Sequence, residues 1–229
     1  MKSAEFPVIE FTLDGRPVQA LPGETILQAA RRVGVEIPHL CYKEGYRADG
    51  NCRACVVEIA GERVLAPSCC RAPAAGMQVQ ARSERAMRNQ KMVLELLLAD
   101  MPQQGYKWVE GGQHGELSDW AARLDVKPRE ELRSLQRARP APDLSHPAMA
   151  VNLDACIQCT RCVRACREVQ VNDVIGYAYR GSGAFPVFDL DDPMGASTCV
   201  SCGECVQACP TGALLPRTAF QQTVPRAAT

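Results

Sequence analysis

The first third of the chain contains short runs in which apolar and polar residues partly alternate, a pattern typical of β-strands. The predicted strands are residues 8–13, 17–19, 56–59 and 77–80. A helix is predicted over 26–33, with an apolar face made of Ile26, Ala29, Ala30 and Val33. Asp14-Gly15 is the expected turn between the first two strands, and Gly34 ends the helix. This order predicts a small α+β domain around a cysteine-rich loop.

The middle of the chain has helical periodicity instead. Residues 84–99 place apolar side chains on one helical face, namely Met87, Val93, Leu94, Leu97 and Leu98. Shorter helices are predicted over 117–124 and 129–137, and the prolines at 140, 142 and 147 indicate a stiff linker. Beyond it we expect a β-hairpin near 175–188 and a polar, frayed tail after Leu215.

Composition excludes several function classes. The 229 residues are 46% hydrophobic and 23% charged, which is ordinary for a globular protein. Twenty-six basic residues balance twenty-six acidic ones, so no nucleic-acid partner is expected. No apolar run is long enough for a membrane span, and the N-terminus lacks the apolar core of a signal peptide, so we expect a cytoplasmic protein. Thirteen cysteines in that setting indicate metal or redox chemistry rather than disulfides.

Two copies of one cysteine pattern, C-x2-C-x2-C-x3-C, occupy 156–166 and 199–209. Bacterial two-cluster ferredoxins use this run, and the fourth cysteine of each copy binds the other cluster. We expect that cysteine to start a helix directed toward the other half. One predicted 4Fe-4S cluster is therefore bound by Cys156, Cys159, Cys162 and Cys209, and the second by Cys199, Cys202, Cys205 and Cys166. The alternative is a pair of structural zinc sites, although zinc rarely uses four cysteines within eleven residues.

A separate group of cysteines precedes the repeat. Cys41, Cys52, Cys55 and Cys69 are separated by ten, two and thirteen residues. Plant-type ferredoxins have a shorter first gap but the same tight pair and distant fourth ligand. We predict a 2Fe-2S cluster on these four residues, with disulfides or zinc as alternatives. Cys70 is left over, and we interpret it as a small buried residue.

Other polar residues carry weaker signals. Arg53, Arg161, Arg164 and Arg167 lie near the cysteines, where they could raise potentials or face a partner. A solvated surface is the default interpretation for them. His39, His114 and His146 are expected to be ordinary loop histidines. No nucleophile–base pairing is evident, so we assign no catalytic residue and predict a chain that moves electrons.

Four stretches carry a family resemblance beyond the cysteine spacing: Leu40–Tyr42, Gly50–Glu58, Arg164–Gly176 and Asp192–Cys199. With these, the chain resembles the iron–sulfur arm of NADH-linked oxidoreductases, which includes the large iron–sulfur subunit of respiratory NADH dehydrogenase and the small diaphorase subunit of NAD-reducing hydrogenase. It looks most like the N-terminal part of the alpha subunit of NAD-dependent molybdenum or tungsten formate dehydrogenase. The resemblance covers nearly all of the chain outside 103–140.

The resemblance implies a domain plan and partners. It implies a β-grasp 2Fe-2S ferredoxin-like domain over 1–82, a helical segment and linker over 83–145, a bacterial two-4Fe-4S ferredoxin-like domain over 146–218 and a tail over 219–229. It also implies a flavin/NAD-binding subunit on the 2Fe-2S side and a metal-pterin catalytic subunit on the other. The alternatives are a freestanding ferredoxin-type carrier, a zinc-scaffolded interaction protein, and the diaphorase arm of a hydrogenase-type complex.

The chain departs from the formate dehydrogenase pattern in two ways. The family usually holds a further cluster in the middle region, on a histidine and three cysteines. Here Met101-Pro102, Gly105, Trp108 and Gly115 stand at those places, and His114 alone cannot bind a cluster, so we predict that this cluster is absent. The family chain also continues into a metal-pterin domain, whereas this one ends soon after Leu214. The catalytic part would then be a separate chain, or this protein a shortened paralogue.

Overall fold

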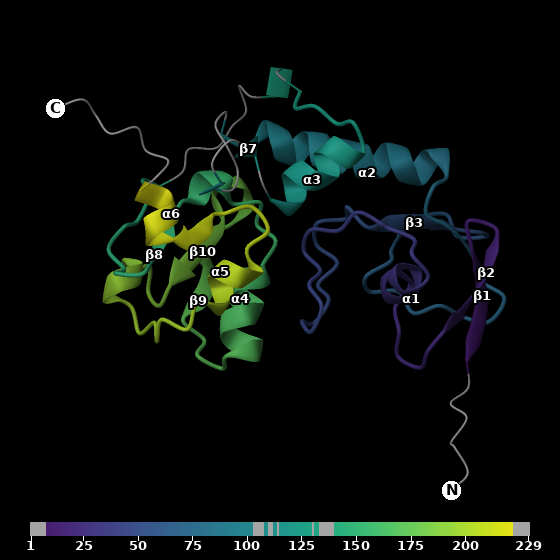
Figure 1. Ribbon diagram of the computed structural model, residues 1–229, viewed down its shortest axis with the longest axis horizontal. Helices are drawn as coiled ribbons and strands as arrows, with labels where there is room; N and C mark the ends of the chain where they lie inside the picture. Colours follow the sequence, from purple (N-terminus) through teal and green to yellow (C-terminus); the bar gives the residue numbers. More distant parts are fainter. Residues whose placement is uncertain are drawn as a thin grey trace, which may run out of the picture. The chain divides into compact units, whose positions relative to one another are not determined.

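The alternating segments of the N-terminal region form a five-stranded mixed sheet in the computed structural model (Figure 1). The strands are β1 (Ile9–Leu13), β2 (Arg16–Ala20), β3 (Val56–Ile59), β4 (Ala66–Pro67) and β5 (Gln78–Gln80). Their order in the sheet is β2-β1-β5-β3-β4, and only the β1–β5 pair is parallel. Four of these strands follow the predicted segments, and the two-residue strand β4 is additional.

The described residues are 8–102, 108–109, 112–113, 115–129, 131–132 and 140–221. The chain divides into two compact units. Unit 1 consists of Met1–Tyr42 and Ala48–Leu94, and unit 2 consists of Lys43–Arg47 and Glu95–Thr229. Unit 1 therefore contains the first group of cysteines, and unit 2 contains the repeat.

Helix α1 (Ile26–Arg32) begins at a capping box. The Thr25 side chain accepts a hydrogen bond from the Gln28 amide at 3.3 Å, and the Gln28 side chain accepts one from the Thr25 amide at 2.9 Å. The helix buries Ile26, Leu27, Ala29 and Ala30. Val33 was expected on this face but is 44% exposed, because the helix ends there and Gly34 turns the chain with a φ of 76°.

One apolar core joins the sheet of unit 1 to α1. Phe11, Leu13 and Val18 from the first hairpin pack with Val57 and Val79 from the other strands. Cys55 and Cys69 belong to the same buried cluster of side chains. The predicted cluster ligands of this unit are thus anchored in its core.

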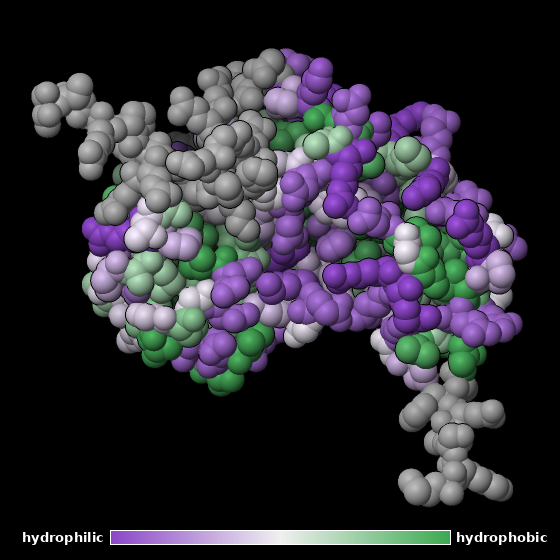
Figure 2. Space-filling view, viewed as in Figure 1, coloured by the Kyte–Doolittle hydropathy of each residue, from purple (hydrophilic) through white to green (hydrophobic). Residues whose placement is uncertain are grey.

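Helix α2 (Glu84–Ala99) has the predicted bounds but a different inner face. Ala86, Gln90, Leu94 and Leu98 are buried, whereas Met87, which was expected inside, is 37% exposed. Gln90 decides the rotation, because its amide donates to the carbonyls of Val56 at 2.9 Å and Ala81 at 3.2 Å. Hydrophilic and hydrophobic side chains are mixed over this helix in Figure 2, in line with the exposure of Met87, Met92 and Leu96.

The described part of unit 2 is built from short elements that include three antiparallel strand pairs, one of them β6 with β7. β9 (Ile175–Ala178) and β10 (Phe185–Phe188) form the predicted antiparallel hairpin. β8 (Met149–Val151) pairs with β11 (Leu214–Pro216), so the start and end of the repeat region are tied together. The remaining strands and helices are β6 (Trp108–Val109), β7 (Gly112–Gln113), α3 (Glu116–Arg123), α4 (Arg161–Arg164), α5 (Glu204–Ala208) and α6 (Arg217–Gln221).

The C-terminal segment differs from its prediction, and another predicted helix lies mostly outside the described residues. The tail was expected to fray after Leu215, but α6 follows and Phe220 packs against Ala150 and Leu215. The predicted helix over 129–137 lies largely outside the described residues, as do Gly105 and His114. Within the part of the chain that the structure describes, no helix is long and apolar enough to cross a membrane.

Gly195 makes a close contact that offers a test of the packing in unit 2. Its amide donates to the Ser145 hydroxyl at 2.8 Å, and a Cβ added there would lie 2.5 Å from the carbonyl carbon and oxygen of Ser145. Gly195→Ala should therefore destabilise the protein by about 1–3 kcal/mol, the usual range for overpacking. A matched control is Gly176→Ala, whose added Cβ meets nothing within 4 Å.

Thermal unfolding of the anaerobic holoprotein measures this difference. Gly195→Ala should lower Tm by several degrees, at about 2–4 °C per kcal/mol for a chain of this length. Gly176→Ala should leave Tm unchanged or slightly higher, because alanine restricts the unfolded chain. Equal Tm values for the two variants would contradict the packing described here.

Candidate iron–sulfur sites

The four cysteines of unit 1 come together at one place. Cys41, Cys55 and Cys69 are buried and Cys52 is half-buried. The Cys41 thiol lies within hydrogen-bonding reach of Cys52 and Cys69, and Cys55 lies within reach of Cys69. These contacts hold the pKa of Cys41 well below its usual range, while hydrogen bonding and burial raise the pKa of Cys52. The four thiols are thus connected through Cys41 and Cys69, and four thiols gathered in this way fit the donor set of a 2Fe-2S cluster.

Local hydrogen bonds bring these loops to the core. The Cys41 amide donates to the sulfur of Cys52 at 3.4 Å. The Ser68 hydroxyl donates to the Cys55 carbonyl at 2.7 Å. At the start of α1, the amides of Ile26 and Leu27 donate to the carbonyls of Arg71 and Ser68, at 2.8 and 3.0 Å. The free donors of the helix terminus therefore fix the segment that carries Cys69.

Cys70 was expected to be buried, but it is exposed. After β4, a turn places the Cys70 amide 3.0 Å from the carbonyl of Pro67. Cys69 then enters the core, and the Cys70 sulfur stays beside it, 3.5 Å from the Cys69 sulfur. An added Cβ at Gly50 would lie 2.8 Å from the Cys70 sulfur, so a larger residue at 50 would collide with it.

The eight cysteines of the repeat surround two separate cavities in unit 2. One is lined by Cys156, Cys159, Cys162 and Cys209. The other is lined by Cys166, Cys199, Cys202 and Cys205. Each cavity takes three cysteines from one copy of the motif and the fourth from the other copy, which is the crossed grouping expected from the spacing. We call these the first and the second cubane site.

The two cubane sites have the same backbone conformation. Gln158 and Ser201, at equivalent positions, have φ of 55° and 59°, and Thr160 and Gly203 have φ of 61° and 77°. In these left-handed conformations, the amides of Gln158 and Ser201 donate to the sulfurs of Cys156 and Cys199, each at 3.4 Å. Three of the four left-handed residues are not glycine and hold a conformation that L-residues adopt infrequently.

We expected the fourth cysteine of each motif to start a helix, but helices α4 and α5 begin before it. Cys162 lies in α4 and Cys205 in α5, so each helix already contains the third cysteine of its run. Cys166 follows in a π-helical turn over Ala165–Val169, and Cys209 comes directly after α5. Residues four apart lie on one helical face, so the helix itself sets the position of the fourth thiol relative to the third.

The electrostatics of the cubane sites favour a bound positive group. Burial raises the pKa of Cys159 and Cys162, and raises that of Cys205 to about 12. The neighbouring cysteines raise these pKa values further, because thiolates repel one another. Bound iron would offset that cost, since metal binding stabilises thiolates. Among the described residues, no three His, Cys, Asp or Glu side chains are arranged to hold a single metal ion.

Two of the four arginines near the cysteines are not on a solvated surface. Arg161 is 1% exposed and Arg164 is 2% exposed, whereas Arg53 and Arg167 are exposed as expected. Arg161 forms two hydrogen bonds to the carboxylate of Glu116, at 2.6 and 2.7 Å. Helix α3 brings that carboxylate to the site, because the Glu116 amide donates to the Pro210 carbonyl at 2.9 Å. Sequence spacing gave no sign of this long-range pair.

His146 is more than an ordinary loop residue. It is 4% exposed, and its Nδ1 accepts hydrogen bonds from the amides of Ala148 and Met149, both at 3.1 Å. With Nδ1 as the acceptor, Nε2 is the nitrogen that donates to the Ser201 hydroxyl, at 3.0 Å. His146 thus ties the chain before β8 to the loop of the second cubane site.

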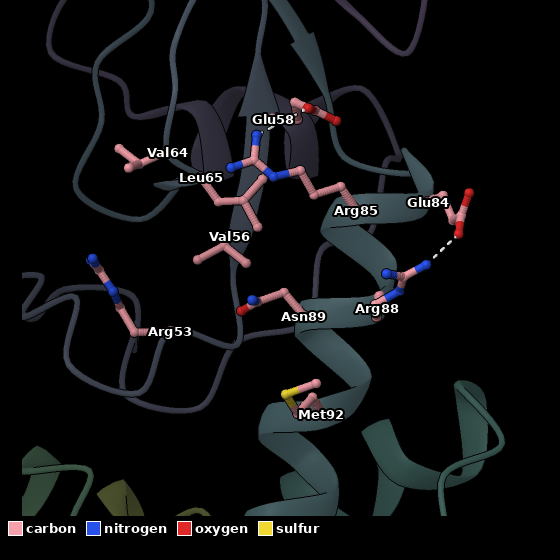
Figure 3. Close-up of a pocket in the computed structure, with 10 residues that line it drawn as sticks. All are labelled: Arg53, Val56, Glu58, Val64, Leu65, Glu84, Arg85, Arg88, Asn89 and Met92. Atoms are coloured by element: carbon pink, nitrogen blue, oxygen red, sulfur yellow. Dashed lines mark hydrogen bonds and ion pairs between the residues drawn. The ribbon is translucent and has the colours of Figure 1, made fainter.

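A groove of about 790 Å³ lies beside the cysteine loop of unit 1 (Figure 3). Val56 and Leu65 form an apolar part of its wall, and Met92 and Asn89 of α2 face it. Its charged lining residues are Arg53, Glu58, Glu84, Arg85 and Arg88. Arg85 pairs with Glu58 and Arg88 with Glu84, so most of this charge is already matched.

Two parts of the chain match known domain families. Residues 7–84 match the 2Fe-2S iron-sulfur cluster binding domain, and residues 155–213 match the 4Fe-4S dicluster domain. The chain is therefore an iron–sulfur protein that combines one 2Fe-2S domain with one two-cluster 4Fe-4S domain. This confirms the cofactor content expected from the cysteine pattern. The assignment of individual cysteines as ligands remains a prediction.

The chain is also similar to subunits of larger NAD(P)H-linked oxidoreductases. The chain is 34% identical over 215 residues to the NADP-reducing hydrogenase subunit HndD of Solidesulfovibrio fructosivorans, covering 91% of this chain and 36% of that protein. It is 34% identical over 210 residues to an NADH-quinone oxidoreductase subunit of Rhizobium meliloti, covering 91% and 24%. It is 32% identical over 213 residues to the 78 kDa subunit of NADH-ubiquinone oxidoreductase of Neurospora crassa, covering 90% and 27%. The chain thus spans about a quarter to a third of these relatives.

A solved structure resembles the chain over almost its whole length. It is a chain of the NAD+-reducing [NiFe]-hydrogenase in the H2-reduced state, with a TM-score of 0.77 and 25% identity, covering 96% of this chain and 90% of that one. The expected resemblance to NADH dehydrogenase and hydrogenase iron–sulfur subunits is confirmed.

The positions of Cys69 and Cys70 make a direct test of ligand choice. Cys69→Ala should remove the 2Fe-2S signal and about two irons per chain, because Cys69 is within hydrogen-bonding reach of both Cys41 and Cys55. Cys70→Ala should keep both. Anaerobic EPR with iron analysis measures this, and loss of the signal in Cys70→Ala but not in Cys69→Ala would reverse the assignment.

Proposed function

We propose that this chain is the iron–sulfur electron-transfer subunit of an NAD-dependent formate dehydrogenase. It would relay electrons between a metal-pterin catalytic subunit and a flavin/NAD-binding subunit. The observation that carries the proposal is the gathering of twelve cysteines into three groups of four, one in unit 1 and two around the cavities of unit 2. Iron–sulfur clusters, when bound, take up and release single electrons.

The chain's own residues would hold the clusters and control their surroundings. The loops present four thiols at each site, and backbone amides donate to Cys52, Cys156, Cys166 and Cys199. Hydrogen bonds to sulfur are one of the means by which proteins adjust cluster potential. Electron transfer is further supported by the names of the relatives, which are NAD(P)H-linked oxidoreductase subunits.

The formate dehydrogenase part of the proposal rests on the sequence stretches Arg164–Gly176 and Asp192–Cys199. The first stretch lies at the second cubane site, where the Val174 amide donates to the Cys166 sulfur at 3.3 Å. In the second, the Thr198 amide and hydroxyl donate to the Asp189 carboxylate, at 2.6 and 3.0 Å. Both stretches therefore shape the loop around the cysteines, so their likeness to formate dehydrogenase concerns the relay itself.

A hydrogenase-type complex is the second candidate. It is favoured by the hydrogenase relative and by the similar chain of a solved hydrogenase. The same relay would then join a flavin subunit to a hydrogen-activating subunit instead of a metal-pterin one.

Substrate-driven reduction separates these functions. The tagged full chain is purified anaerobically from its own organism with whatever subunits accompany it, and EPR is recorded after adding formate, hydrogen or NADH. The proposal predicts that formate and NADH reduce the clusters and that hydrogen does not. Reduction by hydrogen but not formate supports the second candidate. A chain that is isolated alone and is reduced by none of the three overturns both.

A ligand variant tests the relay within the complex. Cys205→Ser should lower formate-dependent NAD+ reduction by at least about tenfold, the scale seen when a metal centre is disturbed. Formate oxidation with an artificial dye acceptor should persist, because the dye bypasses the relay. Cys70→Ala is the matched cysteine control and should retain both activities. Equal loss of both activities in Cys205→Ser would argue against a relay.

A further inference from the structure

The two copies of the cysteine motif carry different charges at equivalent positions. Arg161, between the second and third cysteines of the first copy, corresponds to Glu204 in the second copy. Arg164 corresponds to Gln207. The backbones of the two cysteine loops match, so the first site has a cation where the second has an anion, at Arg161 and Glu204, and a cation where the second has a neutral amide, at Arg164 and Gln207.

Both arginines lie next to the first cubane site. Arg164 donates to the Cys159 carbonyl at 3.1 Å and to the Thr160 hydroxyl at 3.5 Å, and both of these residues line that cavity. Arg161 lies 3.5 Å from the carbonyl of Ala208, the neighbour of Cys209. The Arg161 backbone amide and positive charge both lower the pKa of Cys159, against the larger effect of burial.

The second cubane site has a different electrostatic environment. Glu204 adjoins Gly203 and Cys205, which line that cavity. Its carboxylate accepts a hydrogen bond from the Tyr46 hydroxyl at 2.6 Å and is half-buried. The pKa of Cys205 is raised by burial and then by Cys199, Cys202 and Cys166, the other thiols of the same site.

Burial makes these charges effective. A charge removed from water interacts more strongly with its neighbours, because the surrounding dielectric constant is low. A cluster gains one negative charge on reduction, so a buried cation favours the reduced form and a nearby carboxylate disfavours it. Glu116 offsets part of the Arg161 charge, but its side chain is 42% exposed and therefore more strongly screened.

We infer that Arg161 and Arg164 hold the reduction potential of the first cubane site above that of the second, and that Glu204 widens the difference. Electrons entering the two-cluster domain would then settle on the site of Cys156, Cys159, Cys162 and Cys209. This inference rests on the proposed binding of clusters at both sites. Arg161 and Arg164 would then act through the electrostatic effect of their charges on the reduction potential, without contacting a substrate.

EPR-monitored redox titration of the anaerobic full chain tests the inference. Arg164→Gln should lower the higher of the two 4Fe-4S potentials and shift the equilibrium between the sites at least about tenfold, which is about 59 mV for one electron. Glu204→Gln should raise the lower of the two 4Fe-4S potentials and so also reduce the difference between them. Arg164→Lys, which keeps the charge, should restore most of the difference.

The matched control is Arg167→Gln. Arg167 also lies beside a predicted ligand, Cys166, but its side chain is 54% exposed and pairs with Asp173. Solvent screens such a charge, so this variant should move neither potential appreciably. Unchanged iron content and EPR line shape in the variants would exclude a merely structural effect.

Several results would overturn the inference. One is a change in reduction potential in Arg164→Gln that is no larger than the change in Arg167→Gln. Another is that Arg164→Gln changes the lower of the two 4Fe-4S potentials instead of the higher, or changes both equally. If Arg164→Gln loses iron, the test rests on Glu204→Gln. A smaller difference between the two 4Fe-4S potentials in that variant supports the inference, and an unchanged difference overturns it. A wild-type chain without iron would instead refute the proposed function.

Discussion

Convergence of four thiols on a small cavity is the constraint on which the two-cluster domain depends. Cys156 and Cys159 are separated by only two residues, so the chain must turn tightly to bring both thiols to one cavity. The residues on either side of Cys159, Gln158 and Thr160, are left-handed, and the Gln158 amide donates to the Cys156 sulfur. The second copy repeats this with Ser201 and Gly203. The two cysteine loops therefore have little backbone freedom. The rest of the domain is arranged around them: helices α4 and α5, the β9–β10 hairpin and the β8–β11 pair.

The 2Fe-2S site in unit 1 meets the same requirement in another way. The ten residues between Cys41 and Cys52 allow a longer and less constrained loop. The predicted distant ligand, Cys69, is instead held in place by contacts with the rest of the fold. The segment around Cys69 is held by the first amides of α1, and Cys55 and Cys69 belong to the apolar core. Loss of the cluster would therefore disturb the core, and loss of core packing would disturb the cluster. Metal binding and folding are coupled here.

Local pattern was enough to predict much of this structure. The bounds of α2, the β9–β10 hairpin and the crossed grouping of the repeat cysteines follow from periodicity and spacing. What failed depends on contacts distant in sequence. Met87 is exposed because Gln90 bonds to Val56, and Arg161 is buried because α3 supplies Glu116. Cys70 is exposed because a turn after β4 sends Cys69 inward.

The central claim is that the chain holds three iron–sulfur clusters on twelve of its thirteen cysteines. Metal and sulfide analysis of the anaerobically purified full chain, with EPR after dithionite reduction, tests it most directly. We predict about ten irons per chain, with one 2Fe-2S signal and two interacting 4Fe-4S signals. Zinc without iron would contradict it, and the cysteine groups would then be structural metal sites.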